Sequence, residues 1–227
     1  MMQHLLDNPV WNALISGNKN LSTGNETAKY FLKDVAPFAA VNAVTKENLE
    51  ALYDIADTGD SFAFFSSKEI DIPRLWKVGQ CTRALQMVHD KVSQKKTVSD
   101  DTVALTKNNV PEMLALTKLT NPGPFLKRTI EFGNYEGIFK NGELVAMTGQ
   151  RMHPFEYIEV SAVCTHPEHT GHGYATNLIL RQVENILAQS AIPFLHVKQE
   201  NSNAIKLYNA LGFSARKEMF IYGIKKP

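Results

Sequence analysis

The segment VSAVCTHPEHTGHGYATNLILRQVENI, residues 160–186, carries the pattern that decides the fold of this chain. Val160–Cys164 is an apolar run rich in β-branched residues, which predicts a buried strand. Pro167 ends that strand, because proline has no backbone N–H for a sheet ladder. Gly171 and Gly173 then form a turn, and apolar residues recur at helical spacing after it. The segment is therefore predicted to form a strand, a glycine turn and a helix.

A glycine turn at the start of a helix is a common anion-binding site. The N–H groups of the first turn lack intrahelical partners, and the helix dipole adds positive potential there. A Walker loop would carry a lysine, but residues 170–176 contain none. A dinucleotide-binding loop would have a third glycine where Thr176 stands and an acidic residue in the next strand, where residues 194–198 have none. We therefore expect a phosphate or pyrophosphate ligand, and a nucleotide-dependent oxidoreductase is disfavoured.

The turn resembles the pyrophosphate loop of the GNAT acyl-CoA N-acyltransferases, whose pattern is Gln/Arg-x-x-Gly-x-Gly/Ala. Thr170 stands at the Gln/Arg position, and Gly173 and Ala175 stand at the last two. A second match follows in residues 194–213, where a short strand precedes a helix that is similar to the fourth helix of that family. Its signature residues are Asn201, Ala204, Tyr208, Leu211, Gly212 and Phe213.

The resemblance covers residues 101–227 and is nearest to the two-lobed branch similar to glycine N-acyltransferases. It implies an α/β fold with a mixed sheet, the GNAT fold, in residues 99–227. Residues 1–98 are expected to form an N-terminal mixed α/β lobe of unrecognised type, for which a degenerate acyltransferase half is one interpretation. Within the lobe we predict a helix in residues 27–34, and after Phe213 we predict two final strands.

The same resemblance implies acetyl-CoA, or another short acyl-CoA, as the donor. Loop N–H groups would hold its pyrophosphate, and the central strand would pair with the pantetheine amides as an added strand. Relatives often carry arginines in the loop, where this chain has Thr170 and His172. Asn201 and Asn203 are either donor contacts or caps of the helix that follows. The residues expected at the donor site are Val163, Cys164, Thr165, Thr170, Gly171, His172, Gly173, Tyr174, Ala175, Asn201 and Asn203.

Two residues are candidates for proton transfer in an acyl transfer to an amine. Glu159 precedes the donor strand contacts at the spacing of the glutamate base of some family members, and it is the predicted base. Glu156, His153 and a water relay are alternatives. Tyr208 stands at the position of the family tyrosine whose hydroxyl faces the thioester sulfur, and it is the predicted acid; a core aromatic is the alternative.

Composition excludes several classes of protein. The formal net charge of +1 gives no excess of positive charge that would favour binding to nucleic acid or to an anionic membrane. No apolar run in the sequence is long enough to span a bilayer. The two cysteines cannot form a disulfide framework, which suits a reduced, cytoplasmic setting. His166, His169 and His172 lie in a turn that does not aim them at one point, so no metal is expected.

The leading prediction is an N-acetyltransferase that moves an acetyl group from acetyl-CoA to a primary amine of a small molecule or peptide. A catalytically silent acyl-CoA sensor is the alternative. We expect a monomer or a homodimer, and the sequence does not identify the acceptor.

Overall fold

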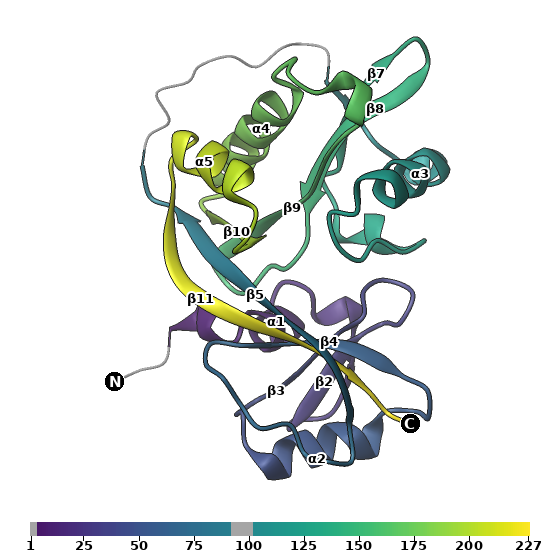
Figure 1. Ribbon diagram of the computed structural model, residues 1–227, viewed down its shortest axis with the longest axis vertical. Coiled ribbons are helices and arrows are strands. Elements are labelled where there is room, and N and C mark those ends of the chain that lie inside the picture. The colour runs from purple at the N-terminus through teal and green to yellow at the C-terminus, as the bar shows by residue number, and fades with distance from the viewer. Residues whose placement is uncertain (1–3, 92–101) are drawn as a thin grey trace.

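The computed structural model describes residues 4–91 and 102–227, which form a sheet of eleven strands with helices on both faces (Figure 1). The strands are β1 (Ser22–Gly24), β2 (Ala28–Phe31), β3 (Phe38–Val41), β4 (Ser61–Ser66), β5 (Lys77–His89), β6 (Thr102–Ala104), β7 (Glu136–Lys140), β8 (Glu143–Gln150), β9 (Tyr157–Thr165), β10 (Ile192–Lys198) and β11 (Phe213–Lys225). The α-helices are α1 (Pro9–Ile15), α2 (Lys46–Ile55), α3 (Val110–Thr120), α4 (Tyr174–Ala188) and α5 (Ser202–Ala210). Short 3-10 helices lie at Leu5–Asp7, Lys19–Leu21, Lys107–Asn109, Thr129–Phe132 and Pro167–His169.

The strand order is β1-β2-β3-β4-β11-β5-β10-β9-β8-β7-β6, so the first half of the chain contributes a central strand to the sheet of the second half. Strand β5 lies between β10 and β11 and pairs antiparallel with both. Figure 1 shows the long strands β5 and β11 running through both halves of the molecule. The predicted mixed α/β architecture is confirmed. The predicted division at residues 98/99 falls outside the described residues and stays a prediction.

Two local predictions about the elements are wrong, and both fail because strand pairing overrides local propensity. Residues 28–31 form strand β2 rather than a helix, because they pair with β1 and β3 and bury Phe31. The end of the chain forms one strand, β11, instead of two. The register of β11 against β5 shifts between Ala215 and Lys217, so a β-bulge replaces the predicted break.

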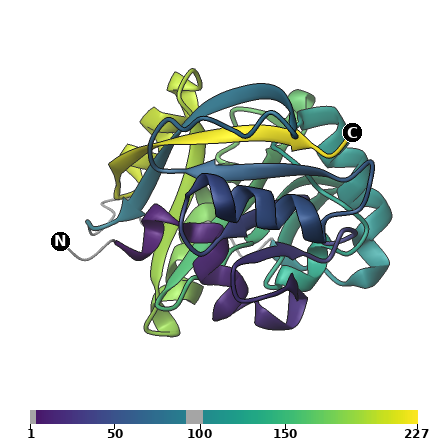
Figure 2. The same cartoon turned by 90° about the horizontal axis from the view of Figure 1, so that it is seen from below.

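The two faces of the sheet are covered by different helices. On β10, Phe194 packs in the cluster that contains α1 and α3 residues, whereas Leu195 packs in the cluster that contains α4 and α5 residues. Helix α2 covers strands of the first half, as the view from below shows (Figure 2). Among the described residues, no helix has both the length and the hydropathy that a bilayer crossing requires.

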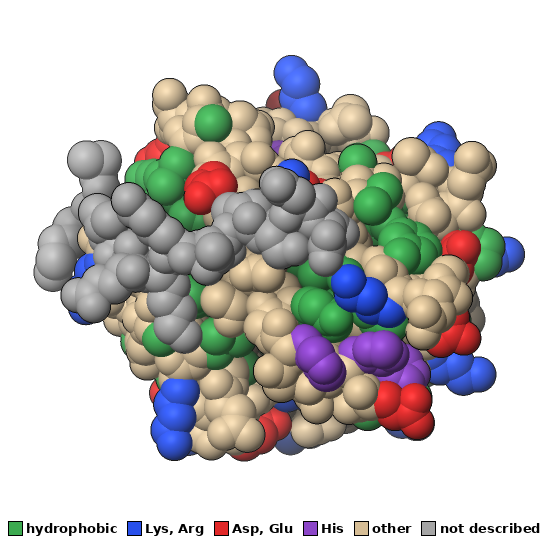
Figure 3. Space-filling view, turned by 90° about the horizontal axis from the view of Figure 1, so that it is seen from above, with side chains coloured by type: hydrophobic (Ala, Val, Ile, Leu, Met, Phe, Trp, Pro, Cys, Tyr) green, Lys and Arg blue, Asp and Glu red, His purple; other side chains and the backbone are tan. Residues whose placement is uncertain are grey.

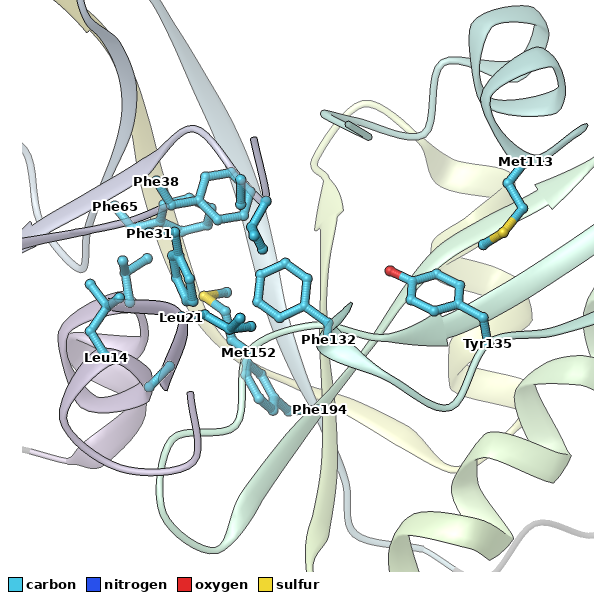
Figure 4. Close-up of a cluster of buried hydrophobic side chains, with 14 of the residues drawn as sticks. Leu14, Leu21, Phe31, Phe38, Phe65, Met113, Phe132, Tyr135, Met152 and Phe194 are labelled. Carbon is cyan, nitrogen blue, oxygen red and sulfur yellow. The ribbon is translucent and has the colours of Figure 1, made fainter. Parts of the chain in front are cut away.

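A core of aromatic rings joins the two halves of the chain (Figure 4). The rings of Phe31 and Phe132 meet edge to face with centroids 5.1 Å apart, and Phe38 lies 6.3 Å from Phe31. Met152 and Phe194 are fully buried in the same cluster. Each such side chain contributes roughly 1.5–3 kcal/mol through burial, so this core fixes the position of the N-terminal strands relative to β9 and β10.

Candidate functional site

Strands β9 and β10 separate after a short pairing, which opens a gap in the centre of the sheet. Their parallel pairing covers three residue pairs and ends at Phe194↔Glu159. Beyond this point β9 continues to Thr165 with β8 as its neighbour. Ala162 has φ +52° and lies where the β9 register shifts against β8, so a β-bulge marks the start of the separation.

The predicted pantetheine strand therefore has backbone groups that face this gap. His166 N–H donates to Val145 O on β8, so by strand alternation the amide of Thr165 points the other way. The amide of Cys164 points to β8, and its side chain is buried in the core. Of the three predicted residues, Thr165 is thus oriented toward the gap through its backbone, while Cys164 is not.

A cleft of roughly 500 Å³ passes through the gap and is lined by both halves of the chain. The second half supplies β9, β10, α5 and the loop at residues 120–124, and the first half supplies β3, β4 and β5. Its lining includes Phe38, Phe65, Arg151, Ala162, Val163, His196, Asn201 and Tyr208.

The predicted pyrophosphate loop lies between the 3-10 helix Pro167–His169 and α4. Gly171 has φ +83° and Gly173 has φ +77°, so both adopt the left-handed conformation that favours glycine. A Cβ added at either position would meet open space, which leaves the backbone approachable. Within residues 4–91 and 102–227, the N–H groups of Gly171, His172 and Gly173 have no acceptor. The loop therefore presents free donors beside the N-terminus of a fifteen-residue helix.

The side chains of this loop form a series of ring contacts. His172 stacks on Tyr174 with centroids 5.4 Å apart, and the rings of His166 and His169 lie 5.6 Å apart. Figure 3 shows histidine side chains gathered on the face seen from above. The Lys140 ammonium lies 5.8 Å from the Tyr174 ring centroid. This lysine adds positive charge near a loop that lacks the arginines of the family pattern.

Helix α5 places Tyr208 at the cleft and caps itself with Asn201. The Asn201 Oδ1 accepts from Ala204 N at 3.1 Å, so this asparagine acts as the cap, and it also lines the cleft. Asn203 is exposed. Tyr208 is 9% exposed, and burial raises its pKa to about 12, so its hydroxyl stays protonated at neutral pH.

Glu159 is fully buried in a network of charged side chains. Arg151 donates to both carboxylate oxygens at 2.7 Å, and His196 Nδ1 lies 2.7 Å from Oε1. Burial raises the pKa of Glu159, but the Arg151 charge and these hydrogen bonds outweigh it and lower the pKa to about 2. Direct removal of a proton from an ammonium by this carboxylate does not fit these facts, because the carboxylate is a weak base and sits behind Arg151 and His196.

The predicted alternatives to Glu159 lie away from the cleft. Glu156 is exposed in the turn that precedes β9. His153 packs against Gly17, its backbone N–H donates to Asn18 Oδ1, and burial lowers its pKa. Neither residue lines the cleft.

Arg151 and His196, which line the cleft beside Glu159, were not predicted from the sequence. His196 is 3% exposed through its side chain and meets the Phe65 ring at 5.3 Å. Arg151 is 13% exposed through its side chain, and its guanidinium lies 5.0 Å from the Phe38 ring centroid. The sequence offered one signal for this pair, a histidine in the strand that follows α4. Its partner Glu159 on β9 is 37 residues away in sequence, so no local pattern indicates their contact.

Comparisons with known proteins agree with this geometry. The sequence profile of the FR47-like protein family matches residues 135–221. A structure from Novosphingobium aromaticivorans assigned to the GNAT family of acetyltransferases is 33% identical, with a TM-score of 0.91, over 99% of this chain and 100% of that one. A GCN5-related N-acetyltransferase from Kribbella flavida is 13% identical, with a TM-score of 0.61, over 96% and 95% of the two chains.

A third structure, an acetyltransferase from Colwellia psychrerythraea, is 12% identical, with a TM-score of 0.55, over 99% of this chain and 98% of that one. The last two likenesses concern the fold alone. No curated protein matches the chain in sequence.

Proposed function

Because the chain belongs to the GNAT family of acetyltransferases, we propose that it transfers an acetyl group from acetyl-CoA to a primary amine of a small molecule or peptide. The observation that carries the proposal is the gap between β9 and β10, whose cleft is lined by Tyr208 and whose strand β9 leads directly into the α4 loop. Kinship with the glycine N-acyltransferase branch stays a prediction. The free thiols Cys81 and Cys164 suit a reducing, cytoplasmic compartment.

The donor would bind across the loop and the gap. The free N–H groups of Gly171, His172 and Gly173 support pyrophosphate binding, and the α4 N-terminus adds positive potential. The backbone of Thr165 and the position of Val163 at the cleft support pairing with the pantetheine amides. This arrangement would place the thioester near Ala162 and Tyr208, where the cleft connects the two faces of the sheet.

The reaction would be a direct transfer. The amine nitrogen attacks the thioester carbonyl, the C–N bond forms, the C–S bond breaks, and the thiolate takes a proton. Tyr208 supports the last step, because this residue lines the cleft and its protonated hydroxyl could donate to the sulfur as charge develops.

The acceptor would lose its proton to the Glu159–His196 pair rather than to Glu159 alone. His196 lines the cleft, whereas Glu159 is buried behind it and accepts its Nδ1–H. An imidazole backed by a carboxylate is a recurrent general base, because the carboxylate stabilises the imidazolium that forms. In this proposal Glu159 acts through His196, and the proton is received at His196 Nε2.

A thiol-release assay with acetyl-CoA and a panel of amino acids, polyamines, aminoglycosides and peptides tests the proposal. Calorimetry with CoA measures donor binding separately. Amine-dependent thiol release supports the transferase. Binding of CoA without release from any amine would instead support an acyl-CoA sensor, which the replacement of loop arginines by Thr170 and His172 favours. If the protein neither binds CoA nor releases thiol, the proposed donor site is refuted.

A further inference from the structure

A row of buried polar side chains crosses the sheet from the cleft to the N-terminal segment. It runs from Glu159 on β9 through His196 on β10 and Gln86 on β5 to Arg216 on β11. Gln86 and His196 are direct cross-strand partners. Arg216 also donates to Asp7 at 2.5 Å, in the 3-10 helix at the start of the described chain. Gln86 is fully buried, so its hydrogen bonds are protected from water.

The orientation of the Gln86 amide is determined by two partners that cannot exchange roles. Its Oε1 accepts from Arg216 Nε at 2.6 Å, and its Nε2 donates to the Leu6 carbonyl at 2.9 Å. A guanidinium has only donors and a carbonyl has only acceptors. Turning the amide by half a rotation would place donor against donor and acceptor against acceptor. The amide nitrogen of Gln86 therefore faces His196.

This orientation also determines which nitrogen of His196 carries the proton. Gln86 Nε2 lies 3.0 Å from His196 Nε2, and an amide nitrogen can only donate. His196 Nε2 must therefore be the unprotonated acceptor, and the ring proton must lie on Nδ1. The Nδ1–H then donates to Glu159 Oε1 at 2.7 Å.

We propose that Gln86 is a positioning residue that holds His196 as the Nδ1-protonated tautomer, so that Nε2 keeps the lone pair an acceptor amine needs. The inference rests on the proposed function and adds to it a residue from the first half of the chain. Gln86 acts through His196 and does not touch substrate. For the proton to reach Nε2, the acceptor N–H has to displace the Gln86 hydrogen bond there, while the Leu6 carbonyl keeps the other amide hydrogen of Gln86. The segment containing Leu6 and Asp7 supports the site through Gln86 and Arg216.

Nitrogen-15 NMR of the histidine side chains tests the proposal without any turnover. The His196 signals are assigned by their loss in a His196→Asn variant. In the wild type we expect Nδ1 protonated and Nε2 unprotonated. Gln86→Glu keeps an acceptor for Arg216 but presents an acceptor to His196, so Nε2 should become protonated. Gln86→Met removes the donor, and we expect a mixture of tautomers. The wild-type spectrum alone decides the tautomer if either variant fails to fold.

Turnover supplies the second measurement. Gln86→Glu should lower kcat by about tenfold or more, while the KM for acetyl-CoA stays within about twofold, because the donor site is separate. Gln189→Met is the control, since Gln189 is an exposed glutamine after α4 whose side-chain amide donates to Asn185 O. It should leave tautomer and turnover unchanged.

Three results would overturn the inference: a wild-type His196 protonated on Nε2, an unchanged tautomer in Gln86→Glu, or an unchanged kcat in that variant despite a changed tautomer. Failure of the proposed function would look different. The tautomers would then follow the expectation, but no amine would release thiol.

Discussion

Replacing Glu159 by glutamine should destabilise the protein strongly, because the carboxylate neutralises a buried guanidinium. Glu159 is fully buried and its pKa falls from the ordinary 4.5 to about 2, mainly because the Arg151 charge outweighs burial. At about 1.4 kcal/mol for each tenfold change in acid constant, the ionised carboxylate stabilises the fold by about 3 kcal/mol. Glu159→Gln also leaves Arg151 without its partner, and breaking a buried pair in this way costs about 3–5 kcal/mol.

The expected loss corresponds to a fall in Tm of about 6–20 °C for a chain of this size. The pH dependence has a definite sign. A carboxyl with a depressed folded-state pKa stabilises the protein above pH 4.5, and this stabilisation is lost as the pH falls from 4.5 toward 2. The difference in unfolding free energy between the wild type and Glu159→Gln should therefore shrink as the pH falls from 4.5 toward 2. Asp7 and Glu131 also have lowered pKa values, from pairing with Arg216 and Arg128, and their contributions cancel in the difference curve.

Calorimetric and urea unfolding between pH 2 and pH 7 measure this prediction. Glu156→Gln is the matched control, because Glu156 is exposed near the same strand and should change stability by less than about 0.5 kcal/mol. The double variant Arg151→Met with Glu159→Gln should recover part of the loss, since no charge is then left unpaired. A Tm of Glu159→Gln within about 2 °C of the wild type, or a difference curve that stays flat below pH 4.5, would refute the reasoning.

Three further changes test the other parts of the site. Tyr208→Phe should lower kcat by about 10- to 10³-fold with unchanged Tm and CoA affinity, because it removes only the hydroxyl; full activity by thiol release would exclude Tyr208 as the acid. Gly173→Val should weaken CoA binding in calorimetry, whereas Gly59→Val, at another positive-φ glycine with open space around it, should strain the backbone and leave binding unchanged; equal affinity in both would argue against the loop. Iodoacetamide should modify exposed Cys81 well before Cys164, because burial raises the Cys164 pKa to about 11; equal rates by peptide mass spectrometry would contradict the buried position of Cys164.

Short-range patterns made the centre of the fold predictable from the sequence. The glycines at 171 and 173, the helix that follows and the N-cap at Asn201 each depend on a few neighbouring residues. The turn at Asn141 and Gly142 is another case, since both residues have the positive φ that this hairpin turn requires. Such local signals remain readable whatever the rest of the chain does.

The tertiary structure alone decided how the two halves of the chain share the site. Strand β5 lies between β10 and β11, and its pairing partners are more than 100 residues away in sequence, where periodicity carries no information about register. That register brings Gln86 beside His196 and leaves His196 beside Glu159. The sequence identified Glu159 as a glutamate in the right strand. Only the contacts with Arg151 and His196 determine its charge and basicity, because the pKa of a buried group is set by its neighbours in space.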